Sequence, residues 1–213
     1  MMMGGVTVVI FAIAIVAYVR FSPEETITLD DNDAVVVSST SSLIGDPNAP
    51  VTLVEFGDFQ WSHCANFALG TGQQIIREYV DTGRVNILYK HFPFIGEESW
   101  RAAEASECAA EQDRFHVYQE TVFVNWNDTN KGNYSDANLR TFGEMTGLLL
   151  KQFDQCMDTN KYLPKVESDR QEAIDAGVNS TPTFFLNGEN ITGPDDYGYY
   201  RVKIEEALAR VGG

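Results

Sequence analysis

The strand-to-helix junction at residues 51–64 constrains the fold of this chain more than any other segment. Val51–Gly57 is a short, mostly apolar run with turn signals on both sides, which predicts a central strand buried on both faces. A short loop follows and leads into a predicted helix. The junction carries the tetrad Trp61-Ser62-His63-Cys64, so one cysteine lies on the first turn of that helix. This arrangement predicts an α/β fold with a candidate reactive site where the strand ends.

The remaining pattern predicts an α/β sheet with one antiparallel edge and helices on both faces. Apolar residues at helical spacing predict helices at 62–80, within 99–158, at 161–176 and at 199–211. Short apolar runs predict further strands at 85–90 and 183–186. Residues 34–37 could form a short first strand. Asn187-Gly188 is a strong signal for a hairpin turn after the strand at 183–186.

The N-terminus favours a membrane anchor. Met1–Val19 contains no charged side chain and Arg20 ends the run, which approaches the ~20 apolar residues that a spanning helix needs. A cleaved signal peptide is the alternative, but it should begin with a charged region and end in a small-x-small site. We therefore expect a single-pass transmembrane anchor at 1–20, an acidic and serine-rich tether at 21–42, and one domain at 43–213. Arg20 alone does not set the orientation of the anchor.

Charge excludes some classes of partner. The chain has 213 residues and a net charge of −16, with no cluster of lysine or arginine. This argues against nucleic acid and against anionic membrane surfaces as partners. The three cysteines and three histidines show no paired ligand spacing, so neither a metal site nor a cofactor is expected.

Four motifs together resemble the DsbA-like thioredoxin-fold family, in its small membrane-anchored or secreted branch. They are V-E-F-G-D-F-Q-x-x-x-C at 54–64, K-H-F-P at 90–93, C-A-A-E-Q-D-R-F at 108–115 and G-V-N-S-T-P-T-F-F-L-N-G at 177–188. The resemblance covers about 43–211. It implies a thioredoxin fold with a helical insertion at about 97–158, and an ancestral activity of thiol–disulfide exchange.

The resemblance also implies roles for particular residues. Cys64 matches the second, more buried active-site cysteine, and Glu55 matches a buried acid that exchanges protons with the site. His63 matches the histidine that, with the helix N-terminus, lowers the pKa of the active-site thiol in strongly oxidising members. Thr181-Pro182 matches a loop whose proline is cis and which docks an extended substrate.

Trp61 departs from the family pattern, because the first, nucleophilic cysteine of the C-x-x-C motif stands at this position in relatives. Without it, no disulfide can form within the motif. Three interpretations of Trp61 stay open: a substrate-contact residue beside Ser62, the mark of a decayed site, or a sequence change. Cys64 is open to two interpretations, a working thiol or a small buried apolar residue.

The resemblance further implies a structural disulfide between Cys108 and Cys156, because some family members have a second bridge with similar spacing. The bridge would close a loop of about 48 residues and leave Cys64 as the odd thiol. The alternative is two separate buried thiols, which a reducing cytosol would favour.

The leading hypothesis is a membrane-anchored, extracytoplasmic protein of thiol–disulfide exchange that acts through Cys64 alone, or is impaired. Its partners would be thiol- or disulfide-bearing proteins and a membrane redox partner. The alternative is a non-redox, chaperone-like module that binds peptides in the groove beside Pro182. A weaker third hypothesis is glutathione-transferase-like chemistry, with Ser62 or Cys64 activating a small thiol.

Overall fold

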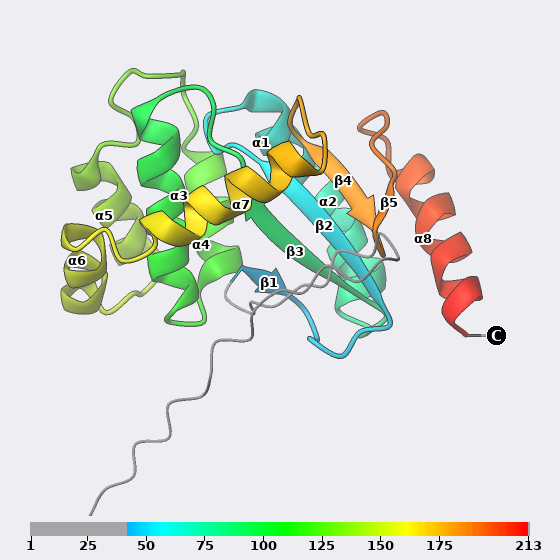
Figure 1. The fold of residues 1–213 in the computed structure, drawn as a ribbon. Helices are drawn as coiled ribbons and strands as arrows, with labels where there is room; N and C mark the ends of the chain where they lie inside the picture. The colour runs from blue at the N-terminus through cyan, green and yellow to red at the C-terminus, as the bar shows by residue number, and fades with distance from the viewer. Residues whose placement is uncertain (1–41, 213) are drawn as a thin grey trace, which may run out of the picture.

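The computed structural model describes residues 42–212, and Figure 1 shows their arrangement. In chain order the elements are β1 (Leu43–Ile44), β2 (Val51–Gly57), α1 (Ser62–Leu69), α2 (Thr71–Ile75), the π-helix η1 (Ile76–Val80), β3 (Val85–His91), α3 (Glu97–Ala110), α4 (Phe115–Val124), α5 (Asp136–Met145), α6 (Leu150–Asp158), α7 (Leu163–Asp175), β4 (Thr183–Leu186), β5 (Glu189–Asn190) and α8 (Tyr197–Val211).

Several N-terminal predictions fall outside these residues. The anchor at 1–20, nearly all of the tether at 21–42 and the strand considered at 34–37 lie in the part that is not described. Within residues 42–212, no helix has both the length and the apolar character that crossing a membrane requires.

In the described part of the chain, five strands form one sheet in the order β1-β3-β2-β4-β5. β2 and β3 are parallel, with Glu55 beside Tyr89, and the other three pairs are antiparallel. The prediction of a single antiparallel edge is wrong, because β1 adds an antiparallel strand at the opposite edge through Leu43 and Ile44. Two residues are too few to leave a periodic pattern in the sequence.

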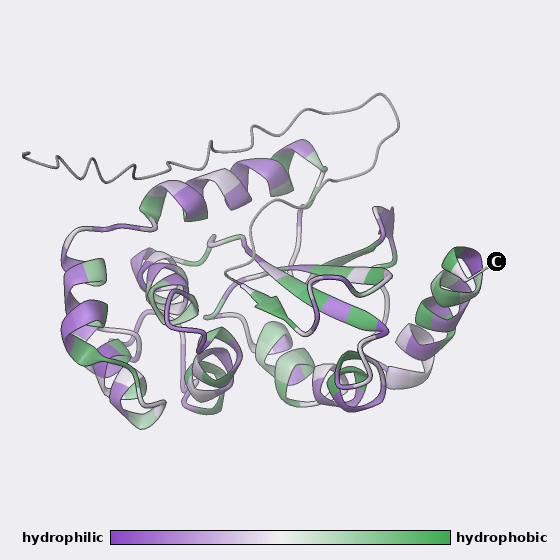
Figure 2. Cartoon of the chain, turned by 90° about the horizontal axis from the view of Figure 1, so that it is seen from below, coloured by the Kyte–Doolittle hydropathy of each residue, from purple (hydrophilic) through white to green (hydrophobic). Residues whose placement is uncertain are grey.

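The sheet is covered on both faces, as predicted. Leu53, Ile87 and Tyr89 point into the larger core, which also contains residues of α1, α2, α4 and α8. Val54 and Phe56 point the other way and pack with Ala173 of α7. Figure 2 shows α7 on one side of the apolar strands and the helices of the larger core on the other. Burial on both faces explains why β2 reads as a nearly continuous apolar run.

The predicted helix at 62–80 is divided into α1, α2 and η1. The first break falls at Gly70, whose φ of −115° and ψ of −94° are not helical. A Cβ at this position would lie 2.8 Å from the Asn66 carbonyl oxygen, so a larger residue would collide with the preceding turn. The break shortens α1 to the segment that carries the site.

The helical insertion is confirmed as four helices, α3 to α6, between β3 and α7. It lies beside one end of the sheet in Figure 1. The mixed α/β architecture with this insertion is therefore the thioredoxin-like fold that the sequence motifs imply.

Candidate active site

The β2–α1 junction holds the tetrad in two different environments. Trp61 caps α1 in an extended conformation and is half-buried. The Cys64 N–H donates to the Trp61 carbonyl at 3.0 Å, which closes the first turn. Cys64 is 0% exposed, whereas His63 is exposed. The thiol therefore lies in the core beneath α1, while the imidazole lies at the surface.

Glu55 is a buried acid on β2, beneath the same helix. It is 3% exposed, and its Oε1 has no hydrogen-bond partner among residues 42–212. Burial raises the pKa of Glu55 to about 8, and the nearby charge of Asp195 adds to the rise. At neutral pH the carboxyl is therefore mostly protonated, and it titrates close to the pH at which a general acid or base works best.

The pKa of Cys64 does not follow the expectation from the resemblance. Burial raises it well above its ordinary value, and the charges of Glu55 and Asp58 raise it further. Hydrogen bonds from the Asp58 amide and the Thr181 hydroxyl lower the pKa of Cys64, but the effect of burial is larger. The expectation that His63 and the start of α1 lower this pKa is therefore wrong. The helix N-terminus does not offset full desolvation of the thiol, and His63 lies at the surface.

The loop between α7 and β4 completes the site. Its Thr181-Pro182 bond is cis. Thr181 is buried, and its hydroxyl lowers the pKa of the Cys64 thiol. Pro182 is half-buried. The fold thus brings together Glu55, Cys64 and Thr181 from three separate segments, and it leaves His63 on the solvent side.

Phe94 is a site neighbour that sequence reasoning missed. Its ring is 6.0 Å from that of Trp61, which lies 5.4 Å from the imidazole of His63. Phe94 is 48% exposed and sits in the loop between β3 and α3. The sequence of a loop does not indicate which residues the loop will contact in the fold. The K-H-F-P motif just before Phe94 was therefore the one signal that pointed toward this region. The three rings form an exposed aromatic surface, which we call the aromatic rim (Trp61, His63 and Phe94).

Asp58 links the loop between β2 and α1, which carries Trp61, to the loop between β3 and α3, which carries Phe94. Its Oδ2 accepts hydrogen bonds from the amides of Phe94, at 2.9 Å, and Ile95, at 3.3 Å. Its Oδ1 accepts from the Gln60 amide at 2.8 Å. Asp58 is 2% exposed, so these bonds satisfy a carboxylate that would otherwise be costly to bury.

Gln60 ties the junction to the helical insertion. Its side-chain amide donates to Ser99 and Asn130, and its Oε1 accepts from the Asn130 amide at 2.6 Å. The Trp126 indole donates to the Gln60 carbonyl at 2.9 Å. The insertion therefore supports the backbone that presents Trp61.

Cys108 on α3 and Cys156 on α6 are joined in a disulfide, with their Cα atoms 5.9 Å apart. Cys64 is the free cysteine of the described part of the chain. The bridge fastens two helices of the insertion, away from the tetrad.

The bridge gives a prediction for stability. Replacing both Cys108 and Cys156 with serine should lower the free energy of unfolding by about 3–4 kcal/mol, because the bridge closes a 48-residue loop in the unfolded chain. Urea denaturation of the double variant and of the oxidised wild type measures the difference. Wild type in strong reductant should match the variant. A difference below about 1 kcal/mol would mean that the bridge does not constrain the unfolded chain.

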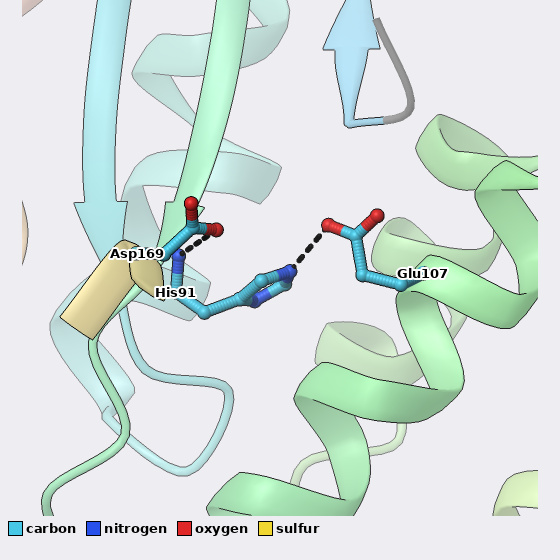
Figure 3. A group of neighbouring side chains, drawn as sticks. All are labelled: His91, Glu107 and Asp169. Atoms are coloured by element: carbon cyan, nitrogen blue, oxygen red, sulfur yellow. Dashed lines mark hydrogen bonds and ion pairs between the residues drawn. The ribbon is translucent and has the colours of Figure 1, made fainter. Parts of the chain in front are cut away.

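A second buried polar group, also missed from the sequence, lies between β3, α3 and α7 (Figure 3). His91 Nε2 is 2.7 Å from Glu107 Oε1, and Asp169 Oδ2 accepts from the His91 amide at 3.2 Å. These three side chains have the geometry of a metal-ligand group. Lys165 already places a positive charge beside both carboxylates, with its ammonium 2.8 Å from Asp169 and 3.7 Å from Glu107. Burial opposes ionisation, but His91 and Lys165 together lower the pKa of Glu107 to about 2.

The fold and the site define a thioredoxin-like protein whose junction keeps one cysteine. The protein-family model described as Thioredoxin matches residues 37–206. The chain belongs to this family.

Relatives and solved structures narrow the resemblance within the family. The probable disulfide bond formation protein D of Bacillus cereus is 29% identical over 170 residues, 78% of each chain. The oxidised crystal structure of BdbD from Bacillus subtilis is similar with a TM-score of 0.74 and 28% identity, over 84% of this chain and all of that one. Alpha-DsbA1 of Wolbachia pipientis is similar with a TM-score of 0.70 and 26% identity, over 80% of this chain and 92% of that one. These neighbours are DsbA-like.

The chain also matches part of a longer protein. The Na(+)/H(+) antiporter NhaA 1 of a Mycobacterium species (strain KMS) is 36% identical over 158 residues. The match covers 24% of this antiporter, so the chain spans about a quarter of the length of the antiporters that it resembles.

Proposed function

We propose that this chain is a DsbA-like protein of thiol–disulfide exchange that acts on thiol- or disulfide-bearing proteins through one thiol, Cys64. The observation that carries the proposal is the placement of Cys64 between the buried carboxyl of Glu55 and the cis Thr181-Pro182 loop. The likeness to disulfide bond formation proteins D of Bacillus species supports the class of reaction.

The chemistry is a single exchange. Glu55, in its ionised form, takes the proton of the Cys64 thiol, and the thiolate attacks one sulfur of a substrate disulfide. A bond forms between Cys64 and that sulfur, the substrate disulfide breaks, and the other sulfur leaves as a thiolate. No second cysteine stands at position 61, so an external thiol must resolve the mixed disulfide. Because the Cys64 thiol is buried with a raised pKa, the exchange should be slow at neutral pH.

Substrate docking belongs to the surface above the thiol. Trp61 and Phe94 offer exposed aromatic area, which suits an apolar side chain of an extended segment. Pro182 and Ser62 border the same site and are both half-buried. In this proposal Trp61, Ser62, Thr181 and Pro182 bind substrate, while Cys64 and Glu55 react.

The proposed place of action rests on the Cys108–Cys156 disulfide and on the apolar N-terminal sequence. A disulfide such as Cys108–Cys156 is expected outside the reducing cytosol. Together with the apolar run at 1–20, it supports a single-pass anchor with an extracytoplasmic domain. A redox partner in the membrane would then supply the resolving thiol.

A Cys64→Ser variant tests the assignment of the thiol. Exchange with a fluorogenic peptide disulfide should fall to the uncatalysed rate, because serine cannot form the mixed disulfide. Glu144→Gln, at an exposed residue outside the site, should keep the wild-type rate. Residual exchange at the wild-type rate in Cys64→Ser would contradict the proposal.

The second candidate is a non-redox peptide-binding module. The complete burial of Cys64 favours it, since a binding surface made of the aromatic rim and Pro182 needs no thiol. The same Cys64→Ser variant separates the two candidates. A binding module would keep its affinity and its function, whereas an exchange protein would keep affinity and lose turnover.

A further inference from the structure

Tyr89 is a buried phenol that the chemistry above does not use. It lies on β3 and is 0% exposed, and its hydroxyl has no hydrogen-bond partner in the described residues. Leaving such a group unpaired is costly, and buried polar groups are usually bonded. Among the described residues, three of the other four fully buried tyrosines donate a hydrogen bond: Tyr79 to Glu205, Tyr118 to the Leu139 carbonyl and Tyr134 to the carbonyls of Phe59 and Val122. An unpaired buried hydroxyl therefore needs a physical reason.

Sheet geometry places Tyr89 on the same face as the site. β2 and β3 are parallel, and Glu55 is beside Tyr89 in the register. Neighbours in register point to the same face of a sheet. Tyr89 and Cys64 also belong to the same core cluster. The phenol is thus buried on the side of the sheet that α1 covers.

Gly57 locates the hydroxyl more closely. A Cβ at Gly57 would collide with the hydroxyl end of the Tyr89 ring, so that end lies against the Gly57 backbone. Gly57 is followed directly by Asp58, whose backbone amide lowers the pKa of the Cys64 thiol by hydrogen bonding. The Tyr89 hydroxyl and the Cys64 sulfur therefore approach the same stretch of backbone, Gly57–Asp58, where β2 ends.

Charge coupling agrees with this placement. After burial, the interaction with Cys64 is the largest cause of the raised pKa of Tyr89, ahead of those with Glu55 and Asp58. Because its pKa is high, Tyr89 stays protonated and can only be a donor to a neighbouring anion. The ionisable groups around the thiol and the phenol are Glu55 from β2, Asp58 from the β2–α1 loop, Tyr134 from the segment before α5, and Asp195 beside Glu55.

We propose that Tyr89 is a positioning residue whose hydroxyl donates a hydrogen bond to the Cys64 thiolate as it forms. The neutral thiol needs no strong donor, which accounts for the unpaired hydroxyl in the resting protein. The thiolate is buried away from solvent, and Tyr89 would add a second side-chain hydroxyl donor to that of Thr181. The inference rests on the proposed function, since it assigns how the same thiol becomes reactive.

Alkylation of Cys64 across pH tests the inference in the full chain. Wild type, Tyr89→Phe and Tyr118→Phe are treated with iodoacetamide between about pH 6 and 10, and the Cys64 peptide is quantified by mass spectrometry. A hydrogen bond to a charged group contributes enough that its loss should slow labelling of Tyr89→Phe roughly tenfold at each pH in this range. Tyr118→Phe loses a buried hydroxyl that bonds to the Leu139 carbonyl, so its labelling rate should match wild type.

The outcomes are distinct. General loosening of the core would expose the thiol and speed labelling, which is opposite to the expected change. An unchanged labelling rate in Tyr89→Phe, or an equal decrease in Tyr118→Phe, overturns the role of Tyr89 and leaves the proposed exchange standing. If Cys64 of the folded wild type is not labelled at any of these pH values, both the role of Tyr89 and the proposed exchange are overturned.

Discussion

A Trp61→Cys variant should gain dithiol–disulfide chemistry that the wild-type chain lacks. Positions 61 and 64 lie on one tight turn, since the Cys64 amide donates to the Trp61 carbonyl at 3.0 Å. A cysteine at 61 would be half-buried like Trp61, next to the N-terminus of α1, where a thiolate is stabilised. With an added oxidant such as glutathione disulfide, the new thiol could form a bridge with Cys64. A substrate thiolate would then attack the sulfur at position 61, and a second substrate thiolate would resolve the mixed disulfide, which leaves the substrate oxidised and the two thiols at 61 and 64 reduced. Oxidation of a reduced unfolded substrate should therefore rise by a factor of about ten or more over wild type.

Two controls separate this gain from simple exposure. Trp61→Ala opens the site without adding a thiol and should show no gain in oxidation. Trp61→Cys combined with Cys64→Ser should attack a disulfide-bearing substrate and hold it as a mixed disulfide, because the junction then has no second thiol to release it. Equal oxidation rates in wild type and Trp61→Cys would mean that the junction does not support this chemistry, and that the family resemblance at the site is only structural.

A Glu55→Gln variant should become more stable than wild type as the pH rises. Below pH 4.5, Glu55 is neutral in both the folded and the unfolded chain. Between 4.5 and about 8, the unfolded chain loses the proton and the folded protein keeps it, so rising pH favours unfolding. The free-energy difference between the variants should grow by up to about 1.4 kcal/mol per pH unit in this window.

Urea denaturation at pH 5, 6, 7 and 8 measures this difference. Glu144→Gln is the matched control, because Glu144 is exposed on α5 and its loss should leave the pH dependence of wild type unchanged. Parallel curves for wild type and Glu55→Gln would show that Glu55 ionises normally in the folded protein, and would remove it as the proton acceptor with a raised pKa.

The fold was largely predictable because its main signals are local. The apolar run of β2 and the Asn187-Gly188 turn each determine their own local conformation. β1 was not predictable at 43–44, since a strand of two residues is defined by its partner β3 and not by its own pattern. Gly70 and Gly72 interrupt the apolar spacing of the predicted helix at 62–80, and the break between α1 and α2 falls at Gly70 for a steric reason. The π-helical geometry of η1 left no such signal in the sequence.

The site was predictable only where a motif names its residues. Cys64, Glu55 and Thr181-Pro182 came from the family pattern, and the fold brings them together. Phe94, Tyr89 and the group His91, Glu107 and Asp169 escaped, because each acquires its neighbours from elements distant in the sequence. The predicted direction of the Cys64 pKa shift was wrong, since the family resemblance implied that His63 stabilises the thiolate, whereas burial determines the outcome.

Mapping of the cysteines after exposure to a peptide disulfide tests the central claim most directly. The folded full chain is incubated with the disulfide, quenched in acid, digested without reductant and examined by mass spectrometry. The account predicts that the peptide is attached to Cys64, while Cys108 and Cys156 are recovered as one bridged pair. Cys64 recovered as a free thiol under conditions where the protein stays folded would contradict the claim that this chain exchanges disulfides.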